Sequence, residues 1–127
     1  MELQNSYKPI LNNRTVLLVT CDQNELNLLG SCLQVRGYYC LSADGSDDAL
    51  ETLRLINASA VIIDTDAITD EASTAAINAI RHRHPSVRVL ALSAAPGHQF
   101  TSIADAVLMR PFKLQQLHDT LVLLLSR

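Results

Sequence analysis

The chain has 127 residues, a formal net charge of −3 and a hydrophobic content of 48%. This length and apolar content suit one compact domain with a buried core, and they exclude an intrinsically disordered chain. The acidic balance argues against binding to nucleic acid or to an anionic membrane through bulk charge. No apolar stretch approaches the roughly 20 residues that are needed to cross a bilayer.

The N-terminal residues show no basic segment followed by an apolar one, so no secretory signal is visible. The cysteines, Cys21, Cys32 and Cys40, are odd in number and lie in apolar segments, which favours reduced thiols over disulfide bonds. We therefore expect a cytoplasmic protein. Residues 1–14 are polar and irregular and are expected to form a leader, and residues 15–127 are expected to form the domain.

From residue 15 onward, short apolar runs of strand type alternate with longer amphipathic runs of helix type. The pattern predicts strands at 15–20, 38–42, 60–64, 87–92 and 106–109. It predicts helices at 23–36, 46–56, 70–83 and 113–126, with a marginal one at 97–103 that Pro96 and Gly97 weaken. Such an alternation predicts a parallel sheet covered by helices on both faces, with the first and third strands at its centre.

The last predicted helix is unusually apolar. Its core repeat consists of Leu114, Leu117, Leu121 and Leu124. Three further apolar residues, Val122, Leu123 and Leu125, surround the end of the helix on nearly all sides. One buried face does not require this many apolar residues, so the pattern predicts a surface for a partner protein.

Polar side chains end several of the predicted strands. Asp64 follows the apolar run 60–63, Ser93 ends the fourth strand, and Arg110 follows the fifth. The carboxyl ends of parallel strands meet at one edge of the sheet, which is where open α/β sheets bind ligands. If the first and third strands are neighbours, Cys21 also meets Asp64 there. The sequence therefore places an acid, a hydroxyl and a cation on one rim.

These motifs, in this order, resemble the receiver domain of bacterial two-component response regulators over residues 14–126. Asp64 matches the phosphate-accepting aspartate, Ser93-Ala94 matches the hydroxyl motif, and Arg110-Pro111-Phe112 matches a Lys-Pro-Phe motif. The resemblance implies an α/β fold with a single, doubly wound, five-stranded parallel sheet. It also implies the flavodoxin-like strand order 2-1-3-4-5 and a signalling role rather than an enzymatic one.

The chain departs from the family pattern at several positions. The two acids that end the first strand in the family are replaced by Thr20 and Cys21, and Asp22 comes one residue too late. The lysine is replaced by Arg110, and the aromatic switch position is Val107, which packs as core and has no ring to rotate. The segment between the fourth and fifth strands is shorter than is usual in the family, so we expect a shortened or missing fourth helix.

In the family, the acid pair, the acceptor and one backbone carbonyl hold Mg²⁺, and that carbonyl would belong to Asp66 here. Thr20 is neutral and Cys21 is a soft ligand that suits Mg²⁺ poorly, so Asp64 is the only carboxylate clearly in place. For a second carboxylate ligand, the side chain of Asp22 or Asp66 would have to rotate toward the metal position. We expect weak or absent Mg²⁺ binding, no other cofactor, and slow or no phosphotransfer.

Two placements of Arg110 stay open. Its guanidinium either forms a bidentate ion pair with Asp64, replacing the missing metal charge, or points to solvent. Ser93 either hydrogen-bonds a phosphoryl group or, as we favour because the metal site is degraded, caps the turn after its strand.

Cys21 admits a different chemistry, because a cysteine at the end of the first strand is a phosphatase nucleophile in other α/β folds. The loop that follows, 22–25, contains no glycine or arginine, and its acids would repel phosphate. Enzymatic and redox roles of Cys21 are therefore minor alternatives, as is a ligand role for His98. His118 is expected on the exposed face of the last helix.

The favoured interpretation is an atypical receiver domain that acts by protein–protein contact, without phosphorylation, through the last helix, the fifth strand and the loop 94–105. The alternative is a working phosphorelay receiver in which Asp64 accepts phosphate from a histidine kinase. The expected partner is a histidine kinase or a downstream effector, and a homodimer through the last helix is also considered. No basic stripe or helix-turn-helix pattern points to DNA.

Overall fold

The computed structural model describes residues 14–95 and 99–126. Its strands are β1 (Thr15–Val19), β2 (Tyr39–Ala43), β3 (Ala60–Asp64), β4 (Arg88–Ser93) and β5 (Ala106–Met109). Its helices are α2 (Gln23–Val35), α3 (Ser46–Leu55), α4 (Asp70–Arg83) and α5 (Leu114–Leu125). All neighbouring strands are parallel and the order is β2-β1-β3-β4-β5, which confirms the predicted fold class.

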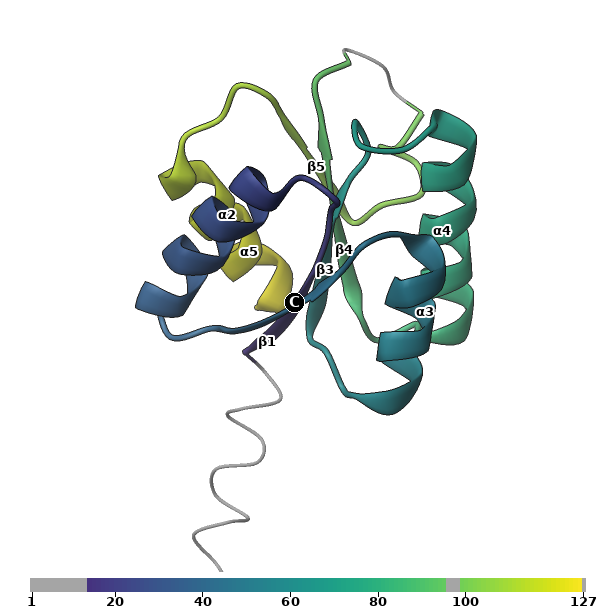
Figure 1. Cartoon of the computed structure of the whole chain (residues 1–127), viewed down its shortest axis with the longest axis horizontal. Helices are drawn as coiled ribbons and strands as arrows, with labels where there is room; N and C mark the ends of the chain where they lie inside the picture. The colour runs from purple at the N-terminus through teal and green to yellow at the C-terminus, as the bar shows by residue number, and fades with distance from the viewer. Residues whose placement is uncertain (1–13, 96–98, 127) are drawn as a thin grey trace, which may run out of the picture.

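Helices cover both faces of the sheet, with α2 and α5 on one side and α3 and α4 on the other (Figure 1). Because side chains alternate along a strand, each central strand contributes to both layers. The layer under α3 and α4 contains Leu17, Val19, Val61, Ile63, Val89 and Ala91. The layer under α2 and α5 contains Val16, Leu18, Ala60, Ile62, Leu90 and Leu92. This two-sided burial explains why the central strands are apolar without alternation.

Local signals determine where α2 begins and ends. Asp22 caps its N-terminus by accepting hydrogen bonds from the backbone N–H groups of Asn24 and Glu25 at 3.0 and 3.2 Å. Gly37 follows its C-terminus with a φ of 92°, a left-handed conformation that favours glycine. Asp22 is therefore an exposed helix cap, and it does not swing toward a metal position as considered above.

The connection from β4 to β5 is short. Residues 99–103 form turns in which the N–H groups of Ile103 and Ala104 donate to the carbonyl of Phe100 at 3.2 and 2.9 Å. Phe100 is buried and packs against the layer under α3 and α4. In residues 99–103, the described part of the marginal helix predicted at 97–103, no helix forms. This confirms, for the described residues, the expectation that the helix between β4 and β5 is shortened or missing. Pro96, Gly97 and His98 lie outside the described residues.

Helix α5 buries most of its core repeat and leaves other apolar residues exposed. Leu117, Leu121 and Leu124 are buried, whereas Val122 and Leu123 are 42% and 69% exposed. His118 was wrongly expected on the exposed face, because its ring packs edge-on against Tyr38, with 6.1 Å between the ring centroids. None of the helices in residues 14–95 and 99–126 has the length and apolar character that a membrane crossing requires.

We expect truncation of Leu121 to destabilise the fold far more than truncation of Leu123, two leucines on the same helix. Leu121→Ala should lower the free energy of unfolding by about 2–5 kcal/mol because it leaves a cavity in the core. Leu123→Ala, on the exposed side, should change it by no more than about 0.5 kcal/mol. Urea denaturation of both variants measures the difference, and similar losses would contradict the packing described for α5.

Candidate functional site

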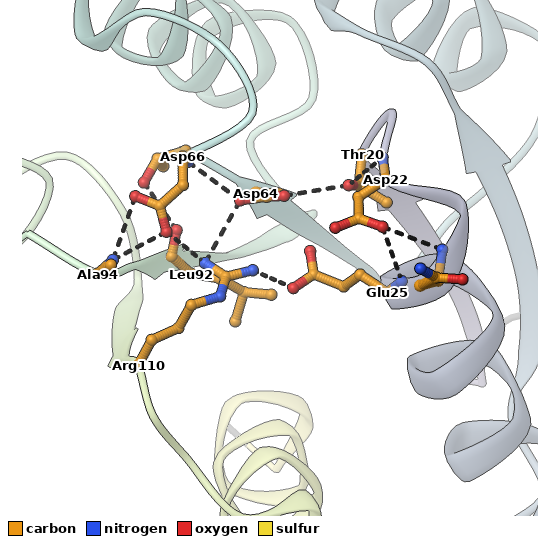
Figure 2. A network of polar contacts seen from close by, with 10 residues as sticks. Thr20, Asp22, Glu25, Asp64, Asp66, Leu92, Ala94 and Arg110 are labelled. Atoms are coloured by element: carbon orange, nitrogen blue, oxygen red, sulfur yellow. Dashed lines mark hydrogen bonds and ion pairs between the residues drawn. The ribbon is translucent and has the colours of Figure 1, made fainter.

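The predicted rim forms at the carboxyl ends of β1, β3, β4 and β5 (Figure 2). Asp64 is the last residue of β3 and is only 6% exposed. Its Oδ2 atom accepts a hydrogen bond from the Thr20 hydroxyl at 3.1 Å, and its Oδ1 atom accepts one from the backbone N–H of Asp66 at 3.0 Å. Thr20, rather than Cys21, therefore meets Asp64. Both carboxylate oxygens of Asp64 already have donors.

Arg110 lies at the centre of the rim, directly after β5. Its Nη2 atom pairs with the Glu25 carboxylate, and its Nη1 atom lies 2.6 Å from Asp66 Oδ2 and 3.4 Å from Asp64 Oδ1. Neither of the two placements considered from the sequence is observed as stated, because Arg110 does not point to solvent and makes only a single contact with Asp64, at 3.4 Å. The bidentate fork to Asp64 is not formed, because the guanidinium divides its closest contacts between Glu25 and Asp66.

Asp66 contributes its side chain to the rim. Its carboxylate accepts a hydrogen bond from the backbone N–H of Ala94 at 2.9 and 3.2 Å and another from Arg110. The intervening residue, Thr65, is buried, and its N–H and hydroxyl both donate to the carbonyl of Leu92, at 3.0 and 2.7 Å. Thr65 thereby fastens the end of β3 to β4 and positions Asp64 and Asp66 on either side of it.

Glu25 is a member of the rim that the sequence analysis missed. It lies in the first turn of α2, and its side chain is 15% exposed. An acid three residues after an N-cap often bonds the N–H of that cap, but the N–H of Asp22 donates to the Thr20 hydroxyl at 3.1 Å. Glu25 instead reaches Arg110. Two features of the sequence could have indicated this role of Glu25. It lies three residues after the helix cap Asp22, and it follows the end of β1, where Thr20 and Cys21 replace the two acids of the family pattern.

The electrostatics of the rim follow from this crowding. Burial raises the pKa of Glu25, the hydrogen bond from Arg110 opposes the increase, and the nearby Asp64 carboxylate adds to it. Burial lowers the pKa of the Arg110 guanidinium, but the bond to Glu25 and the charges of Asp64 and Asp66 outweigh this and raise it. The Oε1 atom of Glu25 is buried without a hydrogen-bond partner in the described structure. Arg110 is therefore firmly cationic, while Glu25 ionises less readily than an ordinary glutamate.

Other predicted site residues lie outside this network. Cys21 is an exposed free thiol. The Ser93 hydroxyl is buried, accepts from the N–H of Ala95 at 3.2 Å and donates to the carbonyl of Ala95 at 3.3 Å. This is the turn-capping geometry favoured from the sequence. Val107 is half-buried and packs against the layer under α3 and α4.

The remaining cysteines are part of the packing. Cys32 is buried and Cys40 is half-buried, and neither is in a disulfide. Burial raises the pKa of the Cys40 thiol to about 11, with a smaller contribution from Cys32. Cys40 is therefore a poor nucleophile at neutral pH. Among the residues that the structure describes, no group of three or more His, Cys, Asp or Glu side chains is arranged to hold a metal ion.

The fold is similar to that of solved response regulators. The chain superimposes on a response regulator from Thermotoga maritima with a TM-score of 0.80 and 23% identity, covering 89% of this chain and 98% of that one. The chemotaxis response regulator CheY4 of Vibrio cholerae gives a TM-score of 0.77 and 20% identity, with coverages of 87% and 97%. The response regulator TrrA from Thermotoga maritima, in complex with Mg²⁺ and BeF, gives a TM-score of 0.78 and 22% identity, with coverages of 87% and 98%.

No protein-family model and no curated protein matches the sequence. The structural matches show that the chain has the receiver fold. At this level of identity, the function has to be argued from the residues of the rim.

We expect Arg110→Ala to lower the free energy of unfolding by about 1–3 kcal/mol, because it leaves the carboxylates of the rim without their shared cation. This value lies below that of a fully buried pair, since the Arg110 side chain is 23% exposed and solvent screens part of the charge.

Arg54→Ala is the matched control. Arg54 pairs with Glu51 at 2.6 Å on the surface, where the two side chains are 67% and 57% exposed. Its removal should change stability within the error of urea denaturation. If both variants lost the same free energy of unfolding, Arg110 would contribute no more to stability than a surface ion pair does.

The raised pKa of Glu25 predicts a pH dependence. The folded state holds this proton more tightly than the unfolded state, in which the pKa is near its ordinary value of 4.5. The resulting stabilisation is fully present below that value and is lost as the pH rises through the raised folded value. The stability of the wild type relative to Glu25→Gln should therefore decline from pH 4.5 toward neutrality. Urea denaturation across this range tests the slope, and a difference that does not vary with pH would contradict it.

Proposed function

We propose that this chain is an atypical receiver domain of two-component signalling that works without phosphorylation, as a non-enzymatic module that binds other proteins. The observation that carries this proposal is the position of Arg110 among Glu25, Asp64 and Asp66. A receiver that accepts phosphate needs a metal ion to neutralise its acids and the incoming phosphoryl oxygens. Here a covalently attached cation already neutralises part of that charge.

The rim residues fit Mg²⁺ poorly. Mg²⁺ requires near-octahedral oxygen ligands, whereas the Thr20 hydroxyl and the Asp66 N–H both direct hydrogens at Asp64. A metal ion at Asp64 would have to displace these donors and approach a guanidinium whose Nη1 atom lies 3.4 Å away. Cys21, at the position of a family acid, is exposed and is a soft ligand. We therefore propose that Mg²⁺ binds weakly or not at all.

The environment of Asp64 also opposes phosphotransfer. An attacking carboxylate oxygen must reach the phosphorus atom of a donor, but Asp64 is buried and both of its oxygens accept hydrogen bonds. Attack would require the loss of at least one of these bonds without a metal to replace it. The alternative of a working phosphorelay receiver is favoured by one observation, the location of Asp64 at the carboxyl end of β3.

We propose that partner proteins bind at α5 and β5, with the adjoining loop 94–105. Leu123 and Val122 present apolar surface near the end of α5, and Met109, the last residue of β5, is 40% exposed. These exposed apolar side chains are the surface that we propose for the contact. The partner class is a histidine kinase or a downstream effector, and a second copy of the chain through α5 is the alternative occupant.

Intact mass after incubation with Mg²⁺ and acetyl phosphate tests the proposal, with Asp64→Asn alongside. We expect no phosphate adduct on the wild type under conditions that fully label an ordinary receiver domain run in parallel. The absence of an adduct would support a domain that binds its partner proteins in a single conformation, without phosphorylation. An adduct that appears on the wild type and disappears in Asp64→Asn would overturn the proposal and establish the phosphorelay function.

A further inference from the structure

We propose that β2 is an edge through which two copies of this chain associate. The two β2 strands pair antiparallel about a two-fold axis, and the pairing joins the two sheets into one. The inference goes beyond the proposed function, because β2 lies at the opposite edge of the sheet from β5, the strand that precedes Arg110. It requires neither phosphate nor a metal ion at Asp64.

Strand β2 has an open side. In the described sheet it is the outermost strand, and β1 is its only neighbour. The N–H of Tyr39 donates to the carbonyl of Arg14 at 2.8 Å, so the backbone groups of Tyr39 face β1. Because these groups point to alternate sides along a strand, the N–H and carbonyl groups of Cys40 and Ser42 point away from β1. They are available to another strand.

The sequence of β2 does not guard this side. Natural edge strands avoid pairing through charged side chains, proline or β-bulges. Strand β2 has five residues, Tyr-Cys-Leu-Ser-Ala, none of which is charged or proline, and its register with β1 is unbroken. Tyr39 and Ser42 are exposed. The strand is therefore regular, uncharged and accessible.

The outward groups fix the register of the pairing. Around a two-fold axis at Leu41, Cys40 of one copy lies opposite the partner's Ser42, and symmetry repeats this pair on the other side of the axis. The two residues of each pair exchange both of their backbone hydrogen bonds. This register uses every outward backbone group of Cys40 and Ser42.

Backbone contacts next to β2 limit the pairing. The N–H of Tyr38 donates to the carbonyl of Leu33 at 3.0 Å, and the N–H of Asp44 donates to the Asp48 carboxylate at 3.0 Å. Because both donors are already occupied, the ladder between the copies ends within β2. So short a ladder predicts a reversible dimer whose population depends on the protein concentration.

Charge complementarity selects a second copy of this chain as the occupant. The exposed Arg14 places its guanidinium over the Tyr38 ring, 5.4 Å from the centroid, and so at the start of β2. Asp44 is exposed directly after the end of β2. The register sets Tyr38 opposite the partner's Asp44, so Arg14 of each copy meets a carboxylate of the other.

The two faces of the seam also suit a second copy. On one face, a cleft of about 250 Å³ between α2 and β2 is lined on its helix side by the uncharged residues Asn27, Ser31 and Gln34. Two copies of this face meet without repulsion between like charges. On the other face, Tyr39 is 60% exposed and falls opposite the partner's Ala43, a residue small enough to leave room for the ring.

The test is sedimentation equilibrium of the full chain across a concentration series. The apparent mass should rise with concentration from 13.9 kDa toward twice that value. Arg14→Asp and Asp44→Arg should each weaken the dimer at least about tenfold, because each sets like charges against one another across the seam. An equal mixture of these two variants should dimerise as the wild type does, since every such contact then joins an aspartate to an arginine.

A further pair of variants tests the seam itself. Ser42→Lys adds an ammonium group of each copy beside the two-fold axis and should weaken the dimer at least about tenfold. Ser86→Lys makes the same change at an exposed position in the turn before β4 and should dimerise as the wild type does. If Arg14→Asp fails to fold, Asp44→Arg and Ser42→Lys, which both change exposed residues, carry the same expectation.

Amide hydrogen exchange reports the pairing directly. The N–H groups of Cys40 and Ser42 should gain protection as the concentration rises, because they become bonded only in the dimer. The N–H of Leu41, which faces β1, should be protected at every concentration.

A chain that stays monomeric up to about 1 mM would overturn the inference, as would a dimer that Ser42→Lys and Asp44→Arg leave intact. A dimer that is lost only in Leu123→Asp would place the contact on α5 and would also overturn it. The measurements use EDTA and no phosphodonor. A phosphate adduct on Asp64 would therefore defeat the proposed function alone, whereas a monomeric chain would defeat the β2 pairing alone.

Discussion

The ionic contacts of Arg110 are the interaction on which the rest of the rim depends. A single planar guanidinium joins a carboxylate from the first turn of α2 to two that flank the end of β3. A lysine ammonium is a compact point charge, whereas the guanidinium presents several donors in a fixed plane and can divide them among several acceptors. Without this cation, the three carboxylates would repel one another and destabilise the helix and strand ends that carry them.

The substitutions along the rim are consistent with one another. An acid at position 20 would add a fourth carboxylate around Arg110, whereas the Thr20 hydroxyl donates to Asp64 and accepts the N–H of Asp22. That second bond leaves Glu25 available for the guanidinium instead of the helix cap. Under the proposed function, the Thr20 hydroxyl stands where the family pattern has an acid, and the Arg110 guanidinium supplies the positive charge that a metal ion would otherwise supply. The rim residues therefore form a connected network of hydrogen bonds and ion pairs around Arg110.

Periodicity predicted the fold well, and every helix or strand that forms begins and ends within one residue of its expected position. Parallel strands buried on both faces read as continuous apolar runs, so the signal is local and strong. The rim was predictable only in its backbone positions, such as Asp64 and Arg110. The role of Glu25 depends on a contact with a residue 85 positions away, and that of Asp66 on the orientation of one side chain, neither of which is encoded in local periodicity.

A rim held in one arrangement limits how the domain can transmit a signal. A modification or ligand shifts a conformational equilibrium only by its difference in affinity for two populated states. If the Arg110 contacts keep a single state populated, and if Val107 offers no ring to rotate, the surface at α5 and β5 has the same affinity for its partner at all times. Regulation must then act on the concentration of the chain or on competition for its partner. If the proposed function holds, the specificity of the domain depends on the exposed apolar end of α5 rather than on Asp64.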